Sequence, residues 1–141
     1  MEQVVEFLTN HLLLTAAWVG IAIVLLIVQL KHMKTGVKSL VPQEVTYKIN
    51  KEDAQVIDMR PVADFNKGHI AGAKNIPQSK LDDSHKELEK HKNNPIILVC
   101  ANGIQAGAAG TKLKKAGFEQ VFKLSGGFQS WVGENLPVVR N

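Results

Sequence analysis

The single cysteine of the chain, Cys100, stands where a nucleophile is expected. It directly follows the apolar run Ile96–Val99 and precedes a short loop, Ala-Asn-Gly-Ile-Gln, after which a helix is predicted to begin near Ala106. In a parallel sheet, ligands bind at the carboxyl ends of the strands, and a loop that leads from a strand into a helix aims its amides inward. Those amides favour the thiolate, which is the nucleophilic form of cysteine. The alternative is a cysteine that serves only as a small apolar side chain.

Two other chemistries do not fit this loop, and no metal is expected near it. A phosphate-binding loop needs G-x4-G-K-[ST], whereas the run Gly107 to Lys112 reads G-A-A-G-T-K. Cysteine phosphatases place an arginine six residues after the nucleophile to hold a phosphoryl group, and position 106 is alanine. His32, His85 and His91 lack metal-ligand spacing with the cysteine, so the sequence predicts neither a metal nor a cofactor.

The elements that would position Cys100 alternate between strands and helices. Strands are predicted over residues 55–59, 96–99 and 121–124, and helices over 42–49, 81–90, 106–116 and 128–132. The continuous apolar run at 96–99 is typical of a central strand covered on both faces. In the helix predicted over 81–90, Leu81 and Leu88 should point inward. Gly117 should end the helix predicted over 106–116. This alternation predicts an α/β fold with a small parallel sheet flanked by helices.

Composition divides the chain into an apolar segment that suits lipid and a more polar part that suits water. The 141 residues are 45% apolar, but 16 of the 19 residues from 12 to 30 are apolar. The remaining residues suffice for one small domain. The expected parts are a short N-terminus (1–11), a transmembrane helix (12–30), a basic juxtamembrane tether (31–39) and an α/β domain (40–141).

The run Leu12–Leu30 is uncharged and fits a bilayer. As a helix it would be about 28 Å long at ~1.5 Å per residue, close to the ~30 Å of the hydrocarbon core. A buried core helix would need more surrounding protein than this chain supplies. A cleavable signal peptide would begin with a positive segment, whereas the residues before the run include Glu2 and Glu6 and no Lys or Arg. We therefore expect this helix to lie in the lipid bilayer.

Basic residues flank the run on one side only. Lys31, Lys34 and Lys38 follow it, and none precedes it. The positive-inside rule therefore predicts a single-pass protein with its N-terminus outside and its C-terminal domain in the cytoplasm. The net charge of +4, without a basic run interleaved with aromatic residues, argues against nucleic acid as a partner.

Two stretches resemble the signature of the rhodanese family, with matching spacing along nearly the whole domain. They are Asp58-Met-Arg60…Asp64-Phe65-Asn-Lys-Gly68-His69-Ile70-Ala-Gly72-Ala73-Lys-Asn75-Ile76-Pro77 and Cys100-Ala-Asn-Gly103, Ala116-Gly117-Phe118…Val121…Leu124…Gly126-Gly127…Trp131. The resemblance implies a rhodanese-like fold and a sulfurtransferase whose active loop has six residues, here Cys100 to Gln105. With the apolar run included, the chain is similar to small rhodanese-like proteins of the bacterial inner membrane.

The family's chemistry, carried to these positions, makes Cys100 the residue that takes sulfur from thiosulfate or a persulfide. The sulfur would be held as a persulfide and passed to a thiol, cyanide or protein acceptor. The amides that hold it would be those of Ala101, Asn102, Gly103, Ile104 and Gln105. Members efficient with thiosulfate often carry arginine at the positions of Ala101 and Gln105, so this loop favours a neutral or protein-borne donor.

The remaining signature residues are expected to support the loop or the fold. Asp58 and Arg60 should form an ion pair beside the active site. His69 should bond to the backbone, and Trp131 should pack in the core.

Two further functions stay open. One is a membrane-tethered interaction module that docks a membrane-protein partner, with the thiol incidental; the arginine-poor loop and the short tether motivate it. The other is redox sensing by Cys100 together with an outside thiol.

Overall fold

The computed structural model describes the backbone of all 141 residues and every side chain except those of residues 32–35 and 85. His32, Lys34 and His85, which the sequence singled out, therefore lie outside the described side chains. The chain divides into two compact units, Met1–Thr35 and Gly36–Asn141. The boundary between them falls inside the stretch 31–39 that was expected to be a tether.

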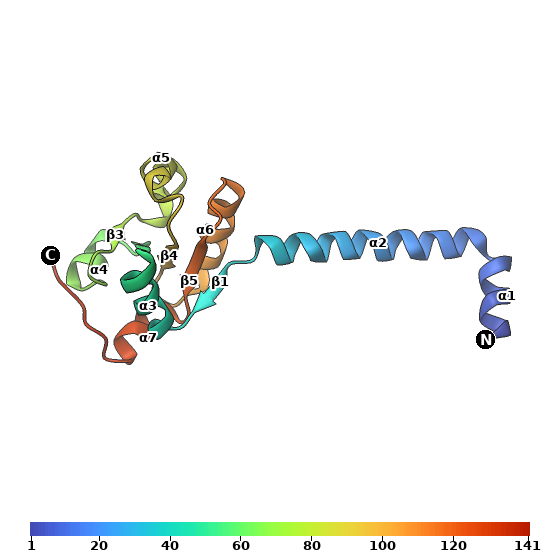
Figure 1. The fold of residues 1–141 in the computed structure, drawn as a ribbon, viewed down its shortest axis with the longest axis horizontal. Helices are drawn as coiled ribbons and strands as arrows, with labels where there is room; N and C mark the ends of the chain where they lie inside the picture. The colour runs from blue at the N-terminus through green and yellow to red at the C-terminus, as the bar shows by residue number, and fades with distance from the viewer. The chain divides into compact units, whose positions relative to one another are not determined.

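The first unit consists of two helices, α1 (Glu2–Asn10) and α2 (Leu12–Thr35), which meet at a bend at His11 (Figure 1). Residues Leu12–Lys31 of α2 have a mean hydropathy of 2.5, and none of this stretch is buried. The stretch is therefore long and apolar enough to cross a membrane. Its exposure does not fit the buried core helix that the sequence analysis argued against.

The second unit is built on a five-stranded parallel sheet with the order β1-β5-β4-β2-β3 (Figure 1). Its strands are β1 (Lys38–Leu40), β2 (Gln55–Asp58), β3 (Lys74–Asn75), β4 (Ile96–Val99) and β5 (Val121–Leu124). All four pairings of neighbouring strands are parallel, which places their carboxyl ends at one edge of the sheet. The predicted α/β class is thereby confirmed.

Helices cover both faces of this sheet. They are α3 (Pro42–Glu52), α4 (Val62–Lys67), α5 (His85–Leu88), α6 (Ile104–Lys115) and α7 (Gly127–Gly133), with 3₁₀ turns η1 (Gln78–Lys80), η2 (Asp82–Ser84) and η3 (Glu89–His91). One core cluster contains Val45 of α3 and Trp131 of α7, and the other contains Leu88 of α5 and Leu113 of α6. Each pair of helices therefore packs on its own face of the sheet.

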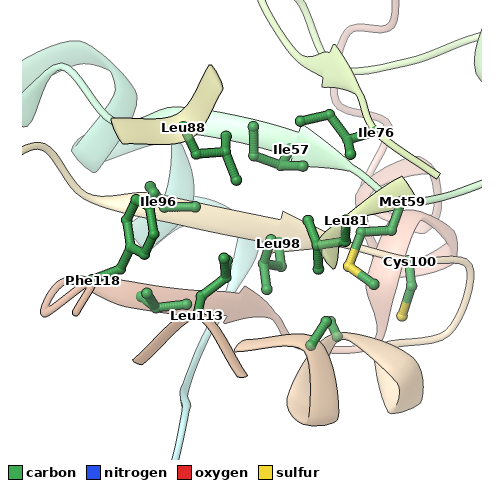
Figure 2. Close-up of a cluster of buried hydrophobic side chains, with 13 residues drawn as sticks. Ile57, Met59, Ile76, Leu81, Leu88, Ile96, Leu98, Cys100, Leu113 and Phe118 are labelled. Carbon is green, nitrogen blue, oxygen red and sulfur yellow. The ribbon is translucent and has the colours of Figure 1, made fainter. Parts of the chain in front are cut away.

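Strand β4 is central because its four residues are apolar and buried on both faces, as predicted. It pairs with β2 on one side and with β5 on the other. Ile96 and Leu98 enter the cluster drawn in Figure 2, whereas Ile97 and Val99 enter the opposite one. Cys100, the next residue, belongs to the Figure 2 cluster and lies near Met59.

The helix predicted over 81–90 is wrong as a continuous element, because these residues form η2, α5 and η3 instead. The hydroxyl of Ser84 donates a hydrogen bond to the carbonyl of Lys80 at 2.8 Å. Such local side-chain bonds compete with a regular helix. Leu81 and Leu88 nevertheless point inward, with 2% and 0% of their surface exposed.

The sequence pattern missed α1, α4, β1 and β3. Strand β1 is a three-residue edge strand in which only Leu40 is buried, so no alternation marks it. Lys38 and Ser39, which were assigned to the tether, pair with Phe122 and Lys123 of β5. The six residues of α4 and the two of β3 are too few to show a period. Helix α2 extends five residues beyond the predicted span 12–30, and the other predicted elements agree with the structure to within three residues at each end.

Candidate active site

Cys100 lies at the carboxyl end of β4, and only 2% of its surface is exposed. Its Sγ accepts a hydrogen bond from the backbone N–H of Gly103, with 3.0 Å between nitrogen and sulfur. Helix α6 begins at the next residue, so the positive end of its dipole lies at the same loop. Both features stabilise negative charge on sulfur.

The loop that follows Cys100 is short, tight and uncharged. Gly103 caps α6 with a φ of +89°, a left-handed conformation that favours glycine. The side-chain oxygen of Asn102 accepts a hydrogen bond from the amide of Ile104 at 3.2 Å. The structure therefore brings the predicted loop residues together, and the amide it bonds to the sulfur is that of Gly103. The other four predicted loop residues have exposed side chains; they are Ala101, Asn102, Ile104 and Gln105.

The first amides of α7 hold this loop in place. The N–H of Phe128 donates to the carbonyl of Cys100 at 2.8 Å, and the N–H of Gln129 donates to the carbonyl of Ala101 at 3.2 Å. Gly126 and Gly127 precede them with φ values of +72° and +64°. A Cβ on Gly127 would overlap the carbonyl oxygen of Cys100 and lie 2.7 Å from the carbonyl carbon of Ala101. Glycine is required here both for its conformation and for its lack of a side chain.

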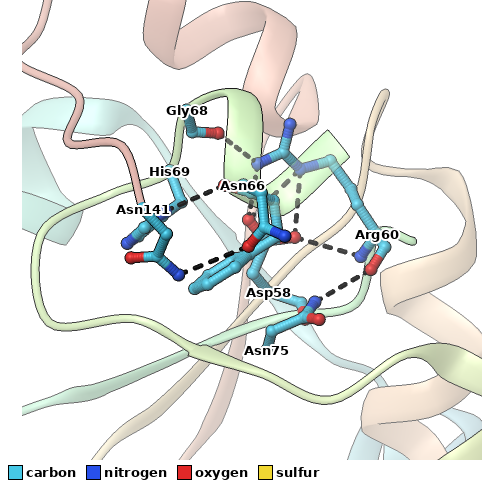
Figure 3. A network of polar contacts seen from close by, with 8 residues as sticks. Asp58, Arg60, Asn66, Gly68, His69, Asn75 and Asn141 are labelled. Carbon is cyan, nitrogen blue, oxygen red and sulfur yellow. Dashed lines mark hydrogen bonds and ion pairs between the residues drawn. The ribbon is translucent and has the colours of Figure 1, made fainter. Parts of the chain in front are cut away.

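A buried ion pair lies beside the loop, at the end of β2. The Nη2 of Arg60 is 2.7 Å from Oδ2 of Asp58, and the two residues are only 7% and 1% exposed. The same Nη2 donates to the carbonyl of Gly68 at 2.7 Å. Asn75 donates from Nδ2 to the carbonyls of Asp58 and Arg60 at 3.1 and 2.9 Å. Figure 3 shows this network, which contains the ion pair expected from the sequence.

Arg60 connects the ion pair to the cysteine loop. Its guanidinium carbon lies 3.7 Å from the centre of the Phe128 ring, a cation–π distance. The amide of that same phenylalanine bonds to the carbonyl of Cys100. The sequence analysis listed Gly127 among the signature residues and placed Phe128 at the start of a predicted helix, but it assigned neither a contact with the cysteine loop. The glycine pair just after the strand predicted over 121–124 was a signal for the role of Gly127, whereas nothing in the sequence marked Phe128.

His69 and Trp131 make contacts that hold the fold together. The Nδ1 of His69 is 2.9 Å from the carbonyl oxygen of Phe65, and the two rings stack with centres 3.8 Å apart. The backbone of His69 also exchanges two hydrogen bonds with Val139, which secures the C-terminal segment. Trp131 is 4% exposed, and its Nε1 donates to the carbonyl of Pro137. Backbone bonding by His69 and core packing by Trp131 are confirmed.

Within the described residues, no group of three or more His, Cys, Asp or Glu side chains is placed to hold a metal ion. His91 precedes β4, whereas Cys100 follows it, so the histidine is separated from the loop by the length of the strand. Burial and the charges of Lys74 and Lys90 lower the pKa of His91, and Asp53 opposes this effect. His91 therefore does not belong to the site.

Replacement of Asp58 by alanine should destabilise the protein strongly, because Arg60 would remain as a buried, unpaired cation. The expected loss is about 3–5 kcal/mol in the free energy of unfolding, measured by urea denaturation of the full chain in detergent. Asp82→Ala is the matched control: it removes an exposed pair with Lys112 and should cost less than about 1 kcal/mol. A double replacement, Asp58→Leu with Arg60→Met, should be milder than Asp58→Ala. Equal effects of Asp58→Ala and Asp82→Ala would contradict this account.

Gly127→Ala should disturb the cysteine loop directly, since its Cβ would meet loop backbone that cannot move aside. We expect a loss of about 2 kcal/mol or more from strained φ and overpacking. Gly133→Ala, in the same helix, meets nothing within 4 Å and should leave the urea midpoint unchanged or slightly raised. Indistinguishable midpoints for the two variants would show that the loop tolerates this contact.

The chain is similar in sequence to known proteins. The family model of the rhodanese-like domain matches residues 41–134. The uncharacterized protein YibN of Escherichia coli (strain K12) is 43% identical over 99% of both chains. The thiosulfate sulfurtransferase GlpE of Pseudoalteromonas translucida is 34% identical over 59% of this chain and 77% of its own.

A solved structure gives the same fold. The rhodanese-related protein from Thermoplasma volcanium superimposes with a TM-score of 0.67 and 31% identity, over 74% of this chain and 99% of that protein. Its similarity extends through nearly all of that protein's own chain. Because the family model covers more than half of the sequence and the fold agrees, this protein belongs to the rhodanese-like domain family.

Proposed function

We propose that this protein is a membrane-anchored sulfurtransferase that carries sulfane sulfur as a persulfide on Cys100. The observation that carries the proposal is the sulfur of Cys100 at the end of β4, with the amide of Gly103 bonded to it. Covalent catalysis needs an activated thiolate, and both the thiolate and the persulfide are anions that an amide and a helix dipole stabilise.

The reaction has two displacement steps. In the first, the Cys100 thiolate attacks the outer sulfur of the donor; a new S–S bond forms, and the donor's S–S bond breaks. The leaving group, which is sulfite or a thiolate, takes the electron pair of the broken bond. In the second step, an acceptor thiolate or cyanide attacks the outer sulfur of the persulfide, and the Cys100 thiolate leaves. No external oxidant or reductant is consumed.

The uncharged loop bears on the choice of donor. Thiosulfate is a dianion, and the five residues after Cys100 include no cationic side chain. Backbone amides are neutral donors and form weaker hydrogen bonds to an anion than a guanidinium does. A persulfide, carried by a small thiol or by a protein, needs less charge compensation than thiosulfate. We therefore place persulfides first among the donors.

The anchoring part of the proposal rests on α2. Its stretch Leu12–Lys31 has the length and hydropathy of a span. Lys31, Lys34 and Lys38 lie at its C-terminal side, so the positive-inside rule puts the rhodanese-like domain in the cytoplasm and the N-terminus outside. The proposed location is the bacterial inner membrane.

A docking module for a membrane-protein partner is the second candidate, and surface features near the loop favour it. Ile104, at the start of α6, is 76% exposed. An open hollow of about 250 Å³ is lined by Phe128, Val132 and Val138 and by the charged side chains of Arg60, Asp64 and Lys67. Apolar surface next to charged side chains suits protein contact. If Cys100→Ser restored the phenotype of a strain that lacks the native protein as well as the wild type does, docking would be favoured over sulfur transfer.

Purified full-length protein should gain the mass of one sulfur atom on incubation with a persulfide donor. Intact mass spectrometry measures the adduct, which should disappear on addition of cyanide or excess thiol. Cys100→Ser is the control and should show no adduct. Absence of the adduct with thiosulfate and with persulfide donors alike would rule out sulfur transfer.

An added cation in the loop should improve the use of thiosulfate. Gln105→Arg places a guanidinium beside the amides, and one charge-assisted hydrogen bond worth about 1 kcal/mol lowers KM roughly fivefold. Gln120→Arg is the matched control, because Gln120 precedes β5 at the other end of the sheet and should leave KM unchanged. Equal KM values for both variants would show that loop charge does not limit thiosulfate binding.

A further inference from the structure

The N-terminal helix α1 separates its apolar and polar residues completely. With about 3.6 residues per turn, one side of the helix is apolar and the other is polar. The apolar side consists of Val4, Val5, Phe7 and Leu8, and the polar side of Glu2, Gln3, Glu6, Thr9 and Asn10. The four apolar side chains are 43% to 61% exposed, and no residue of α1 is buried. Apart from the ring of Phe7, whose centre lies 4.8 Å from that of His11, the described structure leaves this apolar face without a partner.

A bonded corner joins α1 to α2. The helices meet at His11, where Figure 1 shows α1 turning sharply away from the axis of α2. The carbonyl of His11 accepts hydrogen bonds from the backbone N–H of Thr15 at 2.9 Å and from its hydroxyl at 3.0 Å, and the same hydroxyl also reaches the carbonyl of Leu8 at 3.4 Å. A bend leaves helix carbonyls without intrahelical partners, which is costly near lipid unless a side chain bonds to them. The hydroxyl of Thr15 offers such a bond to the carbonyl of Leu8, and Thr15 is the one described residue of α2 that is half-buried.

We propose that α1 lies in the headgroup region of the bilayer that α2 crosses, with its apolar face toward the acyl chains and its acidic face toward water. This inference rests on the proposed membrane anchoring. The partner is a lipid surface because the apolar stretch Leu12–Lys31 begins within two residues of the end of α1. A helix attached at the start of a span, and turned away from its axis, is held at the membrane boundary by the chain itself.

The charges of α1 agree with this placement. Interfacial helices that bind from solution commonly rely on Lys and Arg for attraction to anionic lipids. α1 has none and carries Glu2 and Glu6 on its polar face. Attachment to α2 replaces the missing electrostatic attraction, and repulsion from anionic headgroups turns the acidic face toward water. Burial of the opposite face then fixes the rotation of α1 about its own axis.

Site-directed spin labelling of the full chain tests this placement. Cys100→Ser removes the one cysteine, and a label is then introduced through Val4→Cys, Glu6→Cys or Ile21→Cys. The protein is reconstituted in vesicles of phosphatidylethanolamine and phosphatidylglycerol at 3 to 1 by weight. Power saturation compares collisions with oxygen, which partitions into lipid, and with a water-soluble nickel chelate. Position 4 represents the apolar face, position 6 the polar face, and position 21 the span itself.

The expected result is a several-fold higher ratio of oxygen to nickel collisions at position 4 than at position 6, with position 21 higher still. Equal, nickel-dominated ratios at positions 4 and 6 beside an oxygen-rich position 21 would overturn the placement of α1 and leave the anchor intact. Shielding of position 4 from both reagents would mean that protein, such as a second copy of the chain, covers this face, which also overturns the proposal. A nickel-accessible position 21 would instead refute the anchor.

Discussion

The cysteine loop keeps its shape because the first amides of α7 bond to loop carbonyls. A helix leaves its first N–H groups without partners, and a tight loop leaves carbonyls without partners. Here the amide of Phe128 bonds to the carbonyl of Cys100, so an N–H group at the start of α7 satisfies a carbonyl of the cysteine loop. The contact needs close approach of two backbones, which the absence of a side chain at Gly127 permits.

The buried ion pair acts on the same arrangement from the side of β2. Asp58 holds Arg60 in one orientation through three hydrogen bonds, and the guanidinium then lies over the ring of Phe128. Burial of two charges contributes little net stability, because desolvation offsets their attraction. The value of the pair is geometric: it fixes a flat, cationic surface against the residue whose amide bonds to the cysteine loop. The neighbouring strands β2 and β4 thus each contribute to the same site.

Side-chain patterns made much of the fold and part of the site predictable. The apolar run before Cys100 marked the central strand, and the small residues after it marked a tight turn into a helix. The expected ion pair of Asp58 and Arg60 followed from signature residues. The role of α7 was not predictable, because it acts through backbone amides that any sequence carries. Edge strand β1 was missed for a related reason: one buried residue, Leu40, is enough to hold a strand whose other contacts are backbone bonds.

A loop without cationic side chains and a membrane anchor, taken together under the proposed function, favour sulfur exchange with proteins at the membrane. Uncharged hydrogen-bond donors such as backbone amides bind small anions weakly. The loop itself therefore supplies little affinity for a free anionic sulfur donor. Confinement to the membrane raises the effective concentration of partners at the same surface without any new contact. The exposed side chain of Ile104, within the loop, then offers apolar area that a protein donor covers and a small anion does not. Arginine in the loop would instead favour free anions, because a guanidinium forms stronger hydrogen bonds to them than a backbone amide does.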